Sequence, residues 1–181
     1  MSTHNLNYPA LRAFVGVAAE YCAFIESFEN GRPEELYTTL EMMLSKIHVG
    51  ILPVVAVVAD EENLELEKLG MTHGEWGVIA KLIQAITAEE SDGLSQWHDD
   101  LRGTSKSGDD YCMIRAGMLW DDLADIYRDL HDGLVLWRMG TTESQIEASW
   151  KWRFGYESHW GYHLARAMQS VHEIRYQLND D

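Results

Sequence analysis

Residues 121–133 read Asp-Asp-Leu-Ala-Asp-Ile-Tyr-Arg-Asp-Leu-His-Asp-Gly, and two kinds of side chain in this stretch repeat with the period of an α-helix. Apolar residues continue at spacings of three and four from Leu119 to Trp137, which places them on one narrow stripe. The aspartates form a second stripe, about a third of a turn away. We therefore expect a helix from about Met113 to Met139, stopped by Gly140, whose buried face is flanked by carboxylates.

The aspartate stripe is the first candidate for chemistry in this sequence. Negative charges beside a packing face cost free energy unless cations, hydrogen-bond donors or a metal compensate them. The residues that fall next to the apolar stripe are Asp122, Asp125, Asp129 and Asp132, and the first three are the candidate site residues.

Apolar spacing and end signals indicate four further helices, over residues 9–30, 33–50, 72–86 and 142–178. Capping boxes are expected at Thr72 with Glu75 and at Thr142 with Gln145. The last helix contains no proline, so we expect one long rod, bent at most at Gly155 or Gly161. Short connections make successive helices antiparallel neighbours. The sequence thus predicts an all-α fold, in which residues 1–181 form a single-domain antiparallel bundle of about five helices with a long C-terminal helix.

Two segments do not fit a helix. Residues 51–58 are β-branched enough for a strand, but we find no second strand signal with which they could pair, so we interpret them as a buried or partner-facing connection. Residues 89–110 are rich in Ser, Gly, Asp and Lys, and we expect a long surface loop there.

Composition excludes several classes of function. The 181 residues carry a formal charge of −16, a field that repels phosphate backbones and anionic membrane surfaces, so neither nucleic acid nor a membrane is an expected partner. Cys22 and Cys112 stand far apart and indicate neither a disulfide framework nor a zinc site. No apolar run is long enough to span a membrane, and we expect a cytoplasmic protein.

The last helix carries the residues that could complete a site with the aspartates. The short turn at Gly140 should bring Asp122 and Asp125 level with residues 153–159. Arg153 and Glu157 lie on the apolar stripe of that helix, where charges are unusual. On the adjacent strip lie His159 and His163, spaced four apart as helical metal ligands require.

Two interpretations of this meeting point stay open. In the first, Asp122, Asp125, Glu157, His159 and His163 bind a divalent metal, and Asp129 and Arg153 join them as candidate catalytic residues. In the second, Arg153 neutralises Asp125 or Glu157 in an internal ion pair, and the histidines donate hydrogen bonds to backbone or aspartate oxygens. The residues then organise the helical hairpin without any ligand. Buried networks of the second kind are common in helical proteins, and the spacing favours it.

Two other patterns carry less weight. Glu61-Glu62-x-x-Glu65 followed by Glu89-x-x-Asp92 resembles the signature of all-α nucleotide pyrophosphohydrolases, but in so acidic a chain we interpret it as a solvated face. His98-Asp99 matches the dyad that names a class of hydrolases, yet it falls in the expected loop without further ligands.

The C-terminal third resembles a known family. Residues 121–130, together with the pattern Trp-x-x-x-Phe-x-x-x-x-His-Trp-Gly-x-His at residues 150–163, resemble an uncharacterised bacterial all-helical family catalogued as a domain of unknown function. The match is strongest over residues 119–172, and the first half agrees in helical layout. The resemblance implies an all-α bacterial cytoplasmic protein and no particular activity. It marks as the shared core Asp122, Asp125, Asp129, Trp160, Gly161 and His163.

Two hypotheses of function follow. The first is a non-catalytic binding or regulatory helical protein that needs no cofactor and uses its acidic surface, or residues 51–58, to meet a protein partner or a second copy of itself. The second is a metal-dependent hydrolase that acts on a phosphorylated small molecule or nucleotide. Uptake of a divalent metal separates the two.

Overall fold

The structure is a computed structural model that describes residues 6–28, 33–57, 66, 69–87, 96–104 and 110–177. Its main body confirms the predicted bundle of five helical rods. The last rod is one continuous helix in three parts, α6, η2 and α7. The helical elements are α1 (Tyr8–Ser27), α2 (Pro33–Ile51), α4 (His73–Thr87), α5 (Leu119–Met139), α6 (Thr142–Gly155), η2 (Tyr156–Trp160) and α7 (Gly161–Gln177).

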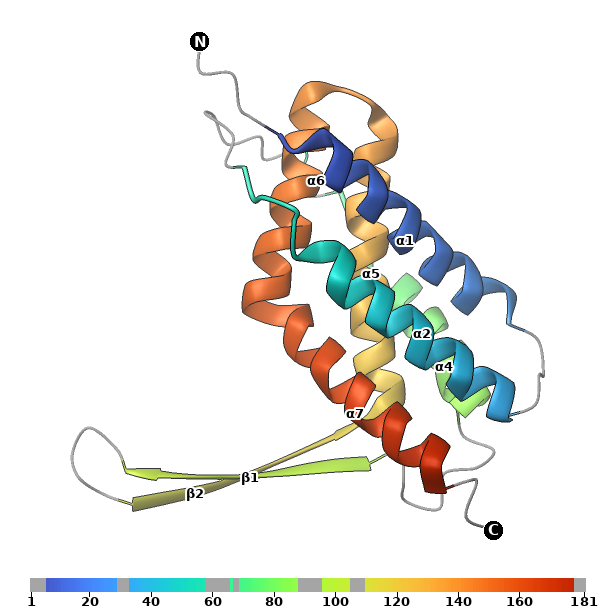
Figure 1. Ribbon diagram of the computed structural model, residues 1–181, viewed down its shortest axis with the longest axis vertical. Coiled ribbons are helices and arrows are strands. Elements are labelled where there is room, and N and C mark those ends of the chain that lie inside the picture. The colour runs from blue at the N-terminus through green and yellow to red at the C-terminus, as the bar shows by residue number, and fades with distance from the viewer. Residues whose placement is uncertain are drawn as a thin grey trace.

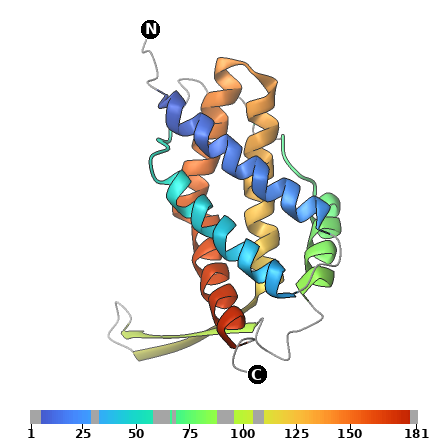
Figure 2. The same ribbon diagram turned by 45° about the vertical axis from the view of Figure 1, so that its right-hand side comes forward.

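The rod formed by α6, η2 and α7 runs antiparallel to α5, and the two make a long hairpin that is the spine of the molecule (Figure 1). α1 and α2, themselves antiparallel, lie obliquely across one side of this hairpin, where α1 contacts α5 and α2 contacts α7. α4 packs against α5 at the edge of the bundle (Figure 2). The seam between α5 and the last rod is therefore the central contact of the fold.

Local sequence signals set the helix ends. Thr72 and Glu75 form the predicted capping box, with the Glu75 carboxylate accepting from the Thr72 N–H at 2.8 Å. Gly140 ends α5 in the left-handed conformation, at φ 76°, which suits glycine. The cap of α6 is Thr141, whose hydroxyl accepts from the Ser144 N–H at 3.1 Å. The cap predicted at Thr142 is thus displaced by one residue.

Tryptophans fill the end of the seam near the α5–α6 turn. Trp152 and Trp160 are fully buried, and Phe14 from α1 packs edge-on against Trp152 with ring centroids 5.3 Å apart. The Trp152 indole N–H donates to the Leu130 carbonyl at 3.2 Å, so its polar atom is satisfied. A Cβ at Gly133 would overlap this indole, which explains a glycine in the middle of α5.

The predicted bend in the last helix is a π-helical turn, η2, between the two glycines at which we expected it. A π turn is wider than an α turn, and the Tyr156 carbonyl lies so close to Gly161 that a Cβ there would overlap it. Such turns rotate the residues that follow relative to those before. Projection at a uniform 100° per residue therefore fails across this segment.

The prediction of a loop over residues 89–110 is wrong for the described part of this segment, which forms strands. Two antiparallel strands, β1 (Gln96–Thr104) and β2 (Asp110–Met118), form a hairpin that extends away from the bundle (Figure 1), with register from Gln96↔Met118 to Thr104↔Asp110. The helix expected from Met113 consequently begins at Leu119. The residues of β1 are mostly polar, so their intrinsic strand propensity does not indicate a strand. Strand formation depends strongly on cross-strand contacts, which the sequence of one segment does not reveal.

The segment that we interpreted as a buried or partner-facing connection is described over residues 51–57. Ile51 and Val54 are buried, whereas Leu52 and Val55 are about half exposed. The segment is thus partly core and partly apolar surface. Within the described residues, no helix is both long and apolar enough to cross a membrane.

Candidate metal centre

The aspartate stripe of α5 faces the last rod, and the first of its residues is the most deeply placed. Asp122 is fully buried, and its Oδ1 lies 2.7 Å from Nδ1 of His163 in α7. A carboxylate accepts only, so the Nδ1–H of the imidazole donates this hydrogen bond. The bond fixes the orientation of the ring, and Nε2 is the nitrogen that remains for another partner.

Asp125 lies on the other side of the same imidazole. Its Oδ2 is 3.4 Å from His163 Nε2, and its side chain is 14% exposed. Its second oxygen, Oδ1, is 3.1 Å from Nη2 of Arg128, one turn further along α5. Asp125 is therefore held by a guanidinium on one oxygen and presents the other to His163.

His159 repeats the arrangement one turn earlier in the rod. Its Nδ1 lies 3.1 Å from Asp129 Oδ2, and its ring centroid is 4.9 Å from that of His163. The hydrogen bond to Asp129 raises the pKa of His159, against the opposing effect of partial burial. The His159 side chain is 43% exposed, so the centre is open to solvent on this side.

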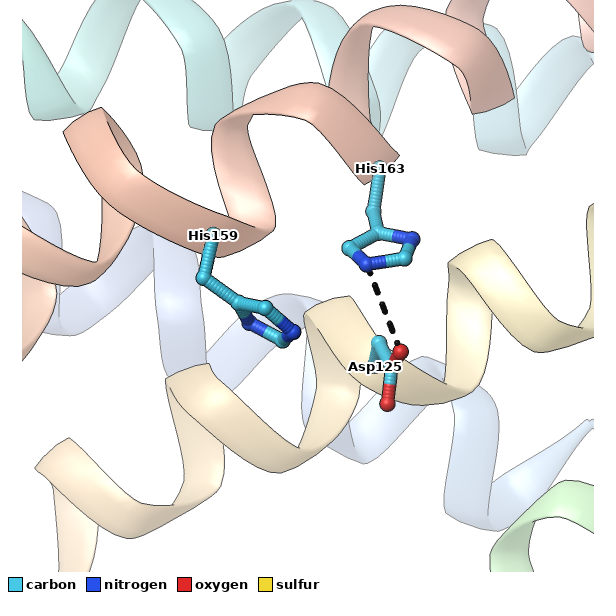
Figure 3. A group of neighbouring side chains, drawn as sticks. All are labelled: Asp125, His159 and His163. Carbon is cyan, nitrogen blue, oxygen red and sulfur yellow. Dashed lines mark ion pairs between the residues drawn. The ribbon is translucent and has the colours of Figure 1, made fainter. Parts of the chain in front are cut away.

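Within the described residues, one group of three side chains could hold a metal ion, because its ligand atoms all lie within 4.8 Å of one another. The group consists of Asp125, His159 and His163. Figure 3 shows the two imidazoles reaching from the last rod toward the carboxylate on α5. Two ligand atoms that each lie about 2.0 Å from a tetrahedral ion are about 3.3 Å apart. The 3.4 Å between Asp125 and His163 already matches that value, and His159 has the freedom of an exposed side chain to close the rest.

Negative charge dominates the surroundings of the centre. Asp121 precedes Asp122 on the same helix, and partial burial, followed by repulsion from Asp125 and Asp122, raises the pKa of its carboxyl. Arg128 is the cation placed among these groups, with Nη2 4.0 Å from Asp129 Oδ2 in addition to its contact with Asp125. A divalent cation at the centre would relieve the remaining repulsion.

The structure brings together five of the seven predicted residues and leaves two apart. Asp122, Asp125 and Asp129 meet His159 and His163 as expected. Arg153 and Glu157 pair with each other at 2.8 Å, which is one of the two ion pairs that the second interpretation expected, and Glu157 is 55% exposed. Glu157 is thus not among the potential metal ligands that lie together within the described residues.

Sequence reasoning missed Arg128 as part of the centre. The signal was available, because a cation three residues after Asp125 on a helix lies beside that carboxylate. Of the weaker patterns, residues 61–65 and 89–92 lie outside the described residues. His98 and Asp99 lie in β1 rather than in a loop.

The comparisons with known proteins show a family and a fold. A family model described as Domain of unknown function (DUF5063) matches residues 7–177. A protein of Bacteroides fragilis, solved by crystallography in a structural genomics programme, is similar in structure, with a TM-score of 0.70, 22% sequence identity, and coverage of 92% of this chain and 95% of that chain. At that identity the likeness shows the fold alone. No curated protein matches the chain.

Proposed function

Because the chain belongs to the family described as Domain of unknown function (DUF5063), whose description names no activity, we propose a function from the centre itself: the protein binds a divalent transition-metal ion between α5 and the last rod. Asp125, His159 and His163 are the ligands. The observation that carries the proposal is that a carboxylate from α5 holds Nδ1 of each histidine, at 2.7 Å for His163 and 3.1 Å for His159.

This arrangement is the one that metal-binding histidines use in proteins. A ligating imidazole donates its other N–H to a carboxylate or carbonyl, which fixes the tautomer and makes the free nitrogen more basic. Here Asp122 and Asp129 accept these hydrogen bonds from the two histidines. The Arg128 guanidinium holds the third ligand, Asp125, by an ion pair. The supporting contacts of all three ligands are therefore present in the fold.

The ligand set indicates which ions suit the centre. Two imidazoles and one carboxylate favour zinc, cobalt or iron over magnesium and calcium, which prefer oxygen ligands. Three protein ligands also leave a coordination position for water, an arrangement that catalytic zinc sites share. The exposed edge of His159 gives that position a route to solvent. The hydrolase hypothesis draws its support from this open position.

The proposal is tested by titrating the metal-free protein with zinc, cobalt, manganese and magnesium in a calorimeter. We expect one zinc ion per chain, similar uptake of cobalt with the visible absorption of a four- or five-coordinate ion, and weak or no uptake of magnesium. Zinc at 100 times its dissociation constant should raise the free energy of unfolding by about 2.7 kcal/mol.

Two histidine variants locate the site. His163→Ala should abolish the zinc signal, whereas His172→Ala should leave it unchanged, because His172 lies on the exposed side of α7 and pairs with Glu41 at 3.2 Å. An absence of zinc uptake at submillimolar concentration would remove the proposal. Equal losses in both variants would show that zinc binds nonspecifically to histidines.

A protein-partner function is the second candidate, and a specific surface favours it. Met42 and Val49 on the outer side of α2 are more than half exposed, and they line an open groove of about 810 Å³ with Val17 of α1. Leu52 and Val55, in the connection that we interpreted as buried or partner-facing, are also about half exposed. Sedimentation velocity of the wild type and of Val49→Asp tests self-association, which should be present in the first and lost in the second.

A further inference from the structure

The position of Arg128 deepens the proposed function and rests on it. Its Nη2 lies 3.1 Å from Oδ1 of Asp125, whose other oxygen faces His163. A metal bound by Asp125 and a guanidinium bound to the same carboxylate stand side by side. One third of the Arg128 side chain is exposed, so this pair of cations is open to solvent.

Metal binding changes what Arg128 faces. In the metal-free centre the Asp125 and Asp129 carboxylates satisfy the guanidinium charge. A metal draws electron density from Asp125 and weakens its attraction for Arg128. The guanidinium has five N–H donors in a planar fork, more than one carboxylate oxygen can use, and the fork matches the oxygens of a phosphate.

We infer that the metal-loaded centre binds a phosphate group, free or at the end of a small molecule, with one oxygen on the open coordination position of the metal and another on the Arg128 guanidinium. The surrounding charge makes this binding conditional. Asp121, Asp122 and Asp129 repel any anion from the metal-free centre, so phosphate enters only when the ion is present. Phosphate suits the position between the metal and the Arg128 guanidinium better than a carboxylate does, because it offers three terminal oxygens and up to two negative charges.

Cobalt-loaded protein, freed of excess metal, tests the inference. Inorganic phosphate should change the visible spectrum of the bound cobalt and release heat, whereas the metal-free protein should give no signal. Arg128→Gln loses the contact that supports Asp125 and should bind cobalt more weakly than the wild type, but saturating cobalt should still load it. The loaded variant should bind phosphate about tenfold more weakly or worse. Arg12→Gln is the matched control, because Arg12 lies on α1 over the Tyr8 ring and should not change either titration.

The outcomes separate this inference from the metal site. A protein that takes up no metal removes the proposed function and the inference together. Metal uptake without a phosphate signal removes the inference alone. Acetate that binds as tightly as phosphate would overturn the phosphate class, and equal phosphate affinity in Arg128→Gln and the wild type would overturn the role of Arg128. An Arg128→Gln variant that even saturating cobalt cannot load would assign Arg128 to metal binding alone and would also overturn that role.

Discussion

The helix α5 packs against the last rod in two different ways along its length. Near the α5–α6 turn the contact is apolar: Gly133 makes room for the Trp152 indole, and both buried indole N–H groups donate to backbone carbonyls. Toward the start of α5, three aspartates and two histidines lie beside the buried apolar residues of the two helices, such as Leu123 and Leu164. The first region needs no ligand, because its large side chains are buried and both of its indole N–H groups are hydrogen-bonded. The second has an excess of negative charge that a cation would balance, which is why we assign stability to the first and ligand binding to the second.

The largest expected effect comes from breaking the apolar region. Gly133→Ala forces a methyl group into the space of the Trp152 indole, and we expect the free energy of unfolding to fall by about 3 kcal/mol. Urea denaturation measures it. Gly16→Ala is the matched control, because Gly16 lies in α1 with no atom near its would-be Cβ, and the change should stabilise by about 0.5–1 kcal/mol. A Gly133→Ala variant as stable as the wild type would show that the packing at this end is loose.

The polar region should respond differently to changes at its two supporting carboxylates. Asp122→Asn removes the charge of a fully buried hydrogen-bond acceptor and should cost about 1–3 kcal/mol in stability. Asp129→Asn changes a more exposed group and should cost less than about 1 kcal/mol. Both should weaken zinc binding by about 10–100-fold, because each releases the ring of a ligand. Denaturation and calorimetry on the same two variants measure the contrast, and unchanged zinc affinity in both would remove their supporting role.

The difference between the two regions also explains what sequence reasoning could reach. The apolar stripes of α1, α5 and the last rod predicted the bundle, because helical period and burial are local properties of the sequence. The aspartates and histidines were placed on facing surfaces for the same reason. The exact pairing, Asp122 with His163 and Asp129 with His159, was not reached, because a π turn leaves no periodic signal in the sequence. The hairpin of β1 and β2 was missed because its pairing is a tertiary property.

A change in pH should affect the stability of the metal-free protein and its zinc affinity in opposite directions. Hydrogen bonding to Asp129 raises the pKa of His159, so the contribution of this pair to the stability of the metal-free protein is present below the unfolded pKa and is lost as pH rises through the folded pKa. Zinc needs the neutral imidazole, so zinc affinity should fall as pH drops through that same raised value. In Asp129→Asn the fall should move to lower pH. Calorimetry across pH 5–8 measures it, and identical pH profiles in the two proteins would contradict this role of Asp129.

The smallest effect is expected at Glu157, where the structure shows the ion pair of the second interpretation. Glu157 was a predicted metal ligand, but its side chain is 55% exposed and pairs with Arg153 at 2.8 Å within the same rod. Glu157→Gln removes an exposed ion pair, and we expect a change in unfolding free energy of less than about 0.5 kcal/mol. Zinc affinity should stay as in the wild type, because no ligand or supporting carboxylate is altered. A tenfold loss of zinc affinity in this variant would mean that the last rod rotates when metal binds and brings Glu157 to the ion. The region that binds the metal would then include the π turn as well as the start of α5.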